Sequence, residues 1–334
     1  MPSSPIEEAS GPLAADTFDD GDSAISNPVS AGLTSLRSSV LRFQEENGRT
    51  YHNMSSGKYY LPNDERENER LDLTHNLWLL SLRGELGLSP KAMQGAKRVL
   101  DAGTGTGIWA IEYADQHPES EVIGVDLSPI QPSLVPPNCA FEIDDLEKEW
   151  TWSQQFDLIF SRYMTGCLAE PEDFVKKAFN NLEPGGYLEM QDILLPYESD
   201  DGTLTEDNPL RHISQLCVDA GNAAGRPFTL PLKYKRYLED AGFVDVVERQ
   251  LKWPLNTWPK DKHYKEIGAW TQENLHSGIE GILVALFTRY LGWTQDQVTL
   301  AALKFRTALK DRNTHGYIPI YVVYGRKPEE PESS

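Results

Sequence analysis

The chain has 334 residues, of which 39% are apolar and 25% are charged, as in ordinary folded globular proteins. Acidic residues outnumber basic residues by 51 to 31, which leaves a formal net charge of −20 at pH 7. This excess of negative charge argues against direct nucleic-acid binding and against docking on anionic membranes, because both need a basic surface.

The cysteines are Cys139, Cys167 and Cys217, an odd number at wide spacing. They fit a reducing compartment and argue against a disulfide framework or a structural zinc site, so we expect no metal ion. No apolar run approaches the ~20 residues of a membrane-spanning helix. Neither a secretory signal nor an Arg-rich presequence is apparent, and we therefore expect a cytoplasmic protein.

The two ends of the chain are predicted to be disordered tails. Residues 1–36 contain six acidic residues and no basic ones, among Ser, Pro, Gly and Ala, and residues 329–334 are similar in character. Such segments bury too little apolar surface to offset the entropy of ordering. Between the acidic tail and the first predicted strand, residues 37–96 are predicted to form an N-terminal helical segment.

A helix is predicted from Asp64 to about Leu86. Asp64 with Glu67 three residues later resembles a capping box. The apolar face of this helix follows helical spacing and includes Leu71, His75, Trp78 and Leu82.

From residue 97 onward, predicted strands and helices alternate. The expected strands are 98–102, 121–126, 140–144, 156–163 and 187–194, and the expected helices between them are 108–114 and 171–182. Strict alternation of this kind predicts an α/β protein with a parallel, doubly wound sheet.

Two insertions are predicted to interrupt this rhythm, at about 196–230 and 254–314. Helices are expected at 209–223 and 231–241, and the second insertion also reads as largely helical. Two late strands, 245–253 and 317–324, are expected to pair antiparallel at the sheet edge. The prediction is therefore one domain, residues 97–328, with a Rossmann-like, mostly parallel seven-stranded sheet and helical cap insertions.

The most informative motif is a glycine-rich turn, Asp101-Ala102-Gly103-Thr104-Gly105-Thr106-Gly107, between a strand and a helix. Glycines allow positive φ and leave the backbone open to a ligand, and the helix N-terminus offers free N–H groups. The dinucleotide fingerprint would need glycine at Ile108. A carboxylate at Asp101 would repel a pyrophosphate and suits a cationic ligand instead.

Further polar residues follow the next three strands. Asp126, with Leu127 after it, closes the second strand, where an acidic side chain can accept from both ribose hydroxyls of a nucleoside. Asp144 and Asp145 follow the third strand, and the pattern does not separate them. The fourth strand ends at Ser161-Arg162, where the arginine either contacts the ligand or forms a salt bridge in the core.

From Val99 to Asp192 the sequence resembles class I S-adenosylmethionine (SAM) methyltransferases. From about Tyr51 onward it is similar to the LaeA-like, or UMTA, methyltransferases of filamentous fungi. The strings that carry this resemblance are YYLPNDE at 59–65, LEPGGYLE at 182–189 and PIYVVYGRKP at 319–328.

The resemblance implies a Rossmann-like fold with SAM as cofactor. The glycine turn would face the methionine end of SAM, and an acidic residue at position 144 or 145 would accept from the adenine amino group. Residues 37–96 would close the cofactor site, and Tyr59 would either cover the cofactor or pack the N-terminal segment. The predicted cofactor-binding residues are Asp101, Gly103, Thr104, Gly105, Gly107, Asp126, Leu127, Asp144, Asp145, Ser161, Arg162 and Tyr59.

The family divides in function between metabolite methyltransferases and regulators. Three functions are therefore predicted for this chain. The first is a methyltransferase that acts on an O or N atom of a small-molecule secondary metabolite, with Glu189, Asp192 and His75 as candidates for a general base. For His75 the alternative is simple packing in its helix. The second is a nuclear regulator of secondary metabolism with a velvet-type protein partner. The third is a protein that binds SAM and catalyses a different reaction.

Overall fold

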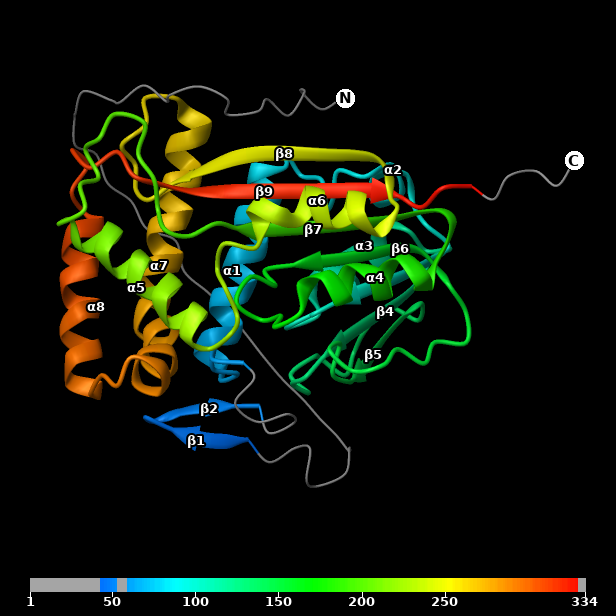
Figure 1. The fold of residues 1–334 in the computed structure, drawn as a ribbon, viewed down its shortest axis with the longest axis horizontal. Helices are drawn as coiled ribbons and strands as arrows, with labels where there is room; N and C mark the ends of the chain where they lie inside the picture. Colours follow the sequence, from blue (N-terminus) through cyan, green and yellow to red (C-terminus); the bar gives the residue numbers. More distant parts are fainter. Residues whose placement is uncertain (1–42, 53–58, 330–334) are drawn as a thin grey trace, which may run out of the picture.

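The structure, a computed structural model, describes residues 43–52 and 59–329. The disorder predicted for residues 1–36, and for 329–334 except residue 329, therefore lies outside the described residues. Figure 1 shows a sheet flanked by helices, with a group of long helices at one end. Among the described residues, no helix combines the length and the apolar character needed to cross a membrane.

The central sheet has seven strands in the order β5-β4-β3-β6-β7-β9-β8. The first five of these pair in parallel, and β7-β9 and β9-β8 pair antiparallel. This confirms the predicted Rossmann-like fold with an antiparallel edge. The strands are β3 (Arg98–Ala102), β4 (Glu121–Asp126), β5 (Cys139–Ile143), β6 (Phe156–Arg162), β7 (Leu182–Ile193), β8 (Val244–Pro254) and β9 (Tyr317–Arg326).

The strand order places a ligand site at one edge of this sheet. From β3 the chain builds outward through β4 to β5, then crosses back to place β6 on the other side of β3. Ligands of open α/β sheets bind at the carboxyl ends of the strands, at the point where the order reverses. That point lies between β3 and β6, beside the glycine turn that follows β3.

Helices cover the sheet and extend it at one end. The helices beside the sheet are α2 (Pro90–Gln94), α3 (Ile108–Gln116), α4 (Pro171–Asn181) and α6 (Pro231–Ala241). The cap consists of α5 (Pro209–Ala223), α7 (Lys262–Tyr290) and α8 (Gln295–Leu309), which fall within the two predicted insertions. In Figure 1 these three helices stand together, with α1 (Glu65–Ser81) between them and the sheet.

The cap and α1 share an apolar core. Trp78 of α1 meets Trp253 of β8 edge to face, with 4.9 Å between ring centroids, and both are fully buried. Leu283 and Phe287 of α7 and Phe305 of α8 belong to the same buried cluster. The cap therefore fixes the position of α1 over the carboxyl edge of the sheet.

The first helix is shorter than predicted. Asp64 caps α1 by accepting from the Glu67 N–H at 3.1 Å, as expected, but the helix ends at Ser81 rather than near Leu86. Arg83 and Gly84 take positive φ values of 59° and 92°, which a helix cannot accommodate.

A short hairpin, β1 (Gln44–Glu46) and β2 (Arg49–Tyr51), was not predicted. Its turn is Asn47-Gly48, with φ of 52° and 73°, the conformation that Asn-Gly favours in two-residue hairpins. The hairpin is held to the start of α1, where Arg49 Nη2 donates to Asp64 at 2.8 Å. The Asn-Gly dipeptide was the available signal.

Candidate active site

A cavity of about 150 Å³ lies at the carboxyl ends of β3, β4, β5 and β6. Its walls are the loops that follow these four strands, and Leu71, Thr74, His75 and Trp78 of α1 line the opposite side. Of the residues predicted to bind the cofactor, the cavity is lined by Asp101, Gly103, Thr104, Gly105, Asp126, Leu127, Asp144, Asp145, Arg162 and Tyr59.

The three glycines of the turn have different roles. All take positive φ: 81° at Gly103, 57° at Gly105 and 83° at Gly107. A Cβ at Gly103 would overlap the Met164 sulfur, and one at Gly107 would overlap the Phe141 ring. A Cβ at Gly105 would meet only a Leu71 methyl at 3.9 Å. Gly105 therefore keeps the backbone open to a ligand, whereas Gly103 and Gly107 permit close packing.

Asp101 is a buried carboxylate at the base of the turn. It is 2% exposed, and the Thr104 hydroxyl donates to it at 2.6 Å. Burial raises the pKa of Asp101 to about 7, although the Thr104 hydrogen bond and the Arg162 charge oppose this. The carboxyl group therefore changes its charge near neutral pH and is stabilised by any cation that enters the cavity.

Asp126 connects the end of β4 to the glycine turn. One carboxylate oxygen accepts from the Gly105 N–H and the other from the Ser128 N–H, both at 2.9 Å. Burial raises the pKa of Asp126, opposed by these backbone hydrogen bonds. Asp126 also lines the cavity, and a carboxylate has about four acceptor sites, so it can shape the turn and still accept from a ligand.

Asp144 and Asp145 both border the cavity, so the structure does not separate them. Asp144 is exposed and its carboxylate accepts from the Asp145 N–H at 2.7 Å. Asp145 is 3% exposed and accepts from the Glu147 N–H at 3.1 Å.

Arg162 projects into the cavity beside His75. Its guanidinium donates to Leu86 O at 3.0 Å, to Gln191 Oε1 at 2.9 Å and toward His75 Nδ1 at 3.2 Å. It also lies 5.2 Å from the Trp78 ring centroid. Burial lowers the pKa of Arg162 to about 9. These hydrogen-bond partners are neutral, whereas the nearby carboxylates of Asp101, Glu189 and Glu112 partly oppose the effect of burial on the pKa. The contact of Arg162 with the ligand stays a prediction.

His75 lines the cavity but is held in its neutral form. Burial, together with the Arg162 charge, lowers the pKa of His75 to about 3. Because arginine only donates, Nδ1 of His75 must accept, and its lone pair is occupied. Nε2 lies 3.1 Å from a Glu112 carboxylate oxygen. This arrangement makes His75 a support for Arg162 rather than a general base.

The prediction that Glu189 and Asp192 face the cleft is wrong in its geometry. Neither lines the cavity, and each is at most 1% exposed. Glu189 accepts from the N–H groups of Leu88 at 2.8 Å and Ser89 at 2.7 Å. Asp192 accepts from the Tyr234 hydroxyl at 2.7 Å and from the Met164 N–H at 3.1 Å. Both carboxylates hold loops in place.

The remaining predicted site residues are Ser161, Gly107 and Tyr59. Ser161 is 1% exposed within β6 and, like Gly107, does not line the cavity. Tyr59 both borders the cavity and packs against the core, so the two alternatives for it coexist.

Several cavity residues were not predicted. They include Leu71, Thr74 and Trp78 on α1 and Tyr163, Met164, Cys167 and Leu168 after β6. The α1 residues share the helical face of His75, so that spacing was a usable signal. The loop after β6 carries no recognisable motif.

Comparison with known proteins gives the family. A model of the methyltransferase domain matches residues 65–248. The methyltransferase pytC of Aspergillus terreus is 36% identical over 299 residues, which cover 89% of this chain and 92% of that protein. The chain belongs to the SAM-dependent methyltransferases.

Two further relatives of this methyltransferase are named as a regulator and as a methyltransferase of protein methionine. The secondary metabolism regulator LAE1 of Cochliobolus heterostrophus is 36% identical over 291 residues, covering 85% of this chain and 95% of that protein. The protein-methionine methyltransferase laeA of Emericella nidulans is 33% identical over 306 residues, which cover 90% of this chain and 81% of that protein.

The cavity of the methyltransferase fits SAM. The methionine end of SAM carries an ammonium, a sulfonium and a carboxylate, and the cavity offers Asp101 and Arg162 in the same region. The open space over Gly105 admits a ligand against the turn. SAM as the cofactor is thus confirmed through the family, while the individual contacts remain predictions.

The raised pKa of Asp101 predicts that SAM binding depends on pH. Between the ordinary aspartate value of 3.8 and about 7, the folded protein holds a proton that the unfolded chain has lost, so the stability of the ligand-free protein falls as pH rises. SAM affinity should rise over the same range, by up to about tenfold per pH unit, because the ionised carboxylate attracts a cation.

Calorimetric titrations from pH 5.5 to 8.5 measure this effect. In Asp101→Asn, SAM binding should be weaker at pH 8 and nearly independent of pH. An Asp101→Asn variant with the same pH slope as the wild type would contradict the assignment.

Proposed function

We propose that this methyltransferase transfers the methyl group of SAM to an O or N atom of a small-molecule secondary metabolite. The observation that carries the proposal is the cavity itself, which continues past the glycine turn to aromatic and apolar walls formed by Tyr59, Tyr163, Met164 and Leu168. Such a space suits a flat organic acceptor. The relative LAE1, which is named as a secondary metabolism regulator, matches 85% of this chain.

Residues 37–96 are proposed to close the cofactor site. Tyr59 and four residues of α1 lie on the cavity wall opposite the strand ends. Strand β8 holds α1 there through the Trp78–Trp253 contact, and cap helix α7 holds it through the hydrogen bond from Arg70 to Asn274 Oδ1 at 2.9 Å. A covered cavity excludes water from the transfer.

SAM supplies a methyl group already activated on a sulfonium, so catalysis consists mainly of alignment. The acceptor–carbon bond forms as the carbon–sulfur bond breaks, and the acceptor proton is released to solvent when the product leaves the cavity. In this chain Asp101 and Arg162 would orient the two charged ends of the amino-acid moiety. The occupied Nδ1 of His75 leaves it no part in removing the proton.

A labelling experiment tests the proposal. The purified protein is incubated with methyl-labelled SAM and a metabolite extract from a strain that lacks the gene. We expect one labelled small molecule, identical to a product that the deletion strain has lost. Label confined to protein, together with a global change in metabolites on deletion, would contradict it.

A regulatory role on protein targets is the second candidate, and Met164 is the observation that favours it. The Met164 sulfur borders the cavity and lies against Gly103 of the cofactor turn. A thioether accepts a methyl group without losing a proton, so no general base is needed. The protein-methionine methyltransferase laeA is a relative.

Intact-mass measurement after incubation with SAM tests this second candidate. Gain of one methyl group in the wild type and not in Met164→Leu would support it. A regulator would also be nuclear and would retain a velvet-type partner in a pull-down. A cytosolic protein with no stable partner and an unchanged mass counts against it.

A further inference from the structure

Tyr163 occupies an unusual backbone position on the cavity wall. It follows β6 with a φ of 63°, in the left-handed region that bulky residues rarely adopt. Its N–H donates to Gln191 O at 2.9 Å, and its carbonyl accepts from Cys167 Sγ at 3.7 Å. Strained residues of this kind cluster at functional sites. The strain turns the aromatic ring toward α1.

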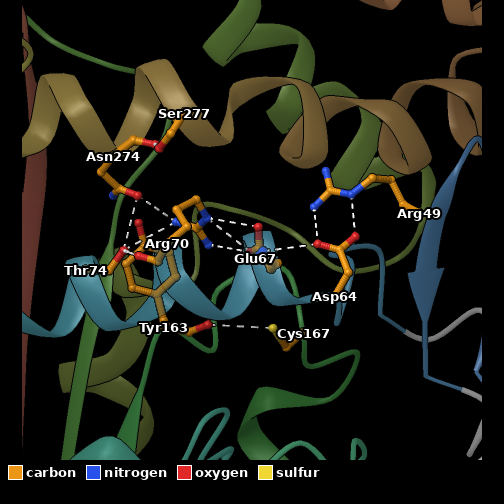
Figure 2. Close-up of polar contacts among 9 residues, drawn as sticks. All are labelled: Arg49, Asp64, Glu67, Arg70, Thr74, Tyr163, Cys167, Asn274 and Ser277. Carbon is orange, nitrogen blue, oxygen red and sulfur yellow. Dashed lines mark hydrogen bonds and ion pairs between the residues drawn. The ribbon is translucent and has the colours of Figure 1, made fainter. Parts of the chain in front are cut away.

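A buried ion pair lies behind the Tyr163 ring. Arg70 Nη2 and a Glu67 carboxylate oxygen are 2.7 Å apart, and both side chains are 2% exposed. Arg70 also donates to Asn274 Oδ1 of α7 at 2.9 Å. Figure 2 shows the Tyr163 ring rising from its loop toward Arg70 and Thr74. Tyr163 and Thr74 line the cavity, whereas Arg70 does not.

This arrangement fixes the chemical role of the phenol. Burial lowers the pKa of Arg70, but the Glu67 carboxylate more than offsets this, so the pKa is raised and the guanidinium stays charged. Arginine has no acceptor atom, so its contact with Tyr163 uses the phenol oxygen and leaves the phenol proton for another partner. Burial raises the pKa of Tyr163 to about 12, partly opposed by Arg70. The phenol is therefore a hydrogen-bond donor at neutral pH.

The cavity near Tyr163 is electrically balanced. Arg70 is neutralised by Glu67, and Glu147 on the wall is paired with Arg226 at 2.8 Å. The other walls here are the apolar or aromatic side chains of Tyr59, Met164 and Leu168. Asp192, whose charge also acts on Tyr163, is held by the Tyr234 hydroxyl and the Met164 N–H. Because these charges of the described chain already have partners, the surroundings of the Tyr163 ring favour an uncharged acceptor.

Tyr163 also lies on the side of the glycine turn where an acceptor could bind next to the cofactor. The glycine turn and the acidic cofactor residues predicted with it follow β3, β4 and β5, whereas Tyr163 follows β6, on the opposite side of β3, directly after Ser161 and Arg162. An acceptor bound beside β6 would lie across the glycine turn from the acidic residues after β4 and β5.

We propose that Tyr163 determines acceptor specificity, by donating its phenol proton to a carbonyl oxygen on the ring of a flat, uncharged aromatic substrate. Arg70 is a positioning residue that orients the phenol. This inference rests on the proposed small-molecule function and names the substrate class within it.

Two probe compounds of nearly equal shape test the inference. Meta-hydroxyacetophenone carries a ketone attached to the ring. In meta-ethylphenol a CH2 group replaces that carbonyl group. Their affinities are measured by ligand-observed NMR on protein saturated with S-adenosylhomocysteine. The wild type should prefer the ketone by about tenfold, the cost of leaving one buried donor unpaired. Tyr163→Phe should bind both compounds alike and retain wild-type affinity for S-adenosylhomocysteine.

Controls separate this inference from the proposed function. Tyr187→Phe, on β7 and outside the cavity, should keep the preference. Arg70→Lys keeps the charge beside Glu67 but loses the planar fork, so the preference should fall. A wild type without the preference, including one that binds neither probe, or a Tyr163→Phe variant that keeps it, overturns the inference. Failure of S-adenosylhomocysteine to bind would instead overturn the proposed function, on which this inference rests.

Discussion

Replacing Gly105 with valine is expected to weaken SAM binding strongly while leaving the protein folded. The added side chain would enter the cavity, because only a Leu71 methyl lies within 4 Å of a Cβ at this position. Its φ of 57° also disfavours a β-branched residue, which would displace the backbone N–H that Asp126 holds. We expect an affinity loss on the order of a hundredfold, about 2.8 kcal/mol.

Gly202→Val is the matched control for this change. Gly202 has a φ of 75° and no atom within 4 Å of its Cβ position, but it lies between β7 and α5, outside the cavity. Because the backbone strain is similar, Gly202→Val should lower the thermal unfolding temperature as much as Gly105→Val does. Calorimetry should nevertheless show an unchanged affinity for SAM. Equal affinity losses in both variants, or wild-type binding by Gly105→Val, would contradict the role assigned to Gly105.

Asp126→Ala should weaken SAM binding by roughly tenfold to a hundredfold, as expected for losing a charge-assisted hydrogen bond in a buried site. The substitution removes the acceptor for the Gly105 and Ser128 N–H groups, so the turn loses its support along with the predicted ribose contact. Calorimetry with SAM and with adenosine separates these effects. Both ligands carry the ribose, and both should lose affinity.

Asp144→Ala provides the comparison for Asp126. Asp144 is an exposed residue on the cavity rim, and its loss should cost less than that of Asp126. Unchanged adenosine affinity in Asp126→Ala would remove the ribose assignment, even if SAM binding fell.

The parallel sheet and the glycine turn were predictable because their signals are local. A buried strand, a glycine turn and a helix succeed one another within a few residues at Arg98–Gln116. The three carboxylates after the turn, Asp126, Asp144 and Asp145, follow strand ends, where side chains meet at one edge of the sheet. Each of these patterns can be recognised from neighbouring residues, without knowing which distant residues they contact.

The error at Glu189 came from distant backbone groups. The N–H donors of Leu88 and Ser89, about a hundred positions earlier, occupy its carboxylate. Backbone donors leave no mark in the sequence, so an acidic residue on a central strand could not be told from a catalytic one. Tyr163 was missed for a related reason, since its left-handed backbone carries neither glycine nor asparagine as a signal.

Calorimetric titration of the wild-type protein with SAM tests the central claim most directly, with NAD as the comparison ligand. We predict saturable binding of SAM at one site per chain, tighter at pH 8 than at pH 6, and no binding of NAD. Absence of SAM binding, or equal binding of NAD, would contradict the assignment of this cavity as a SAM site.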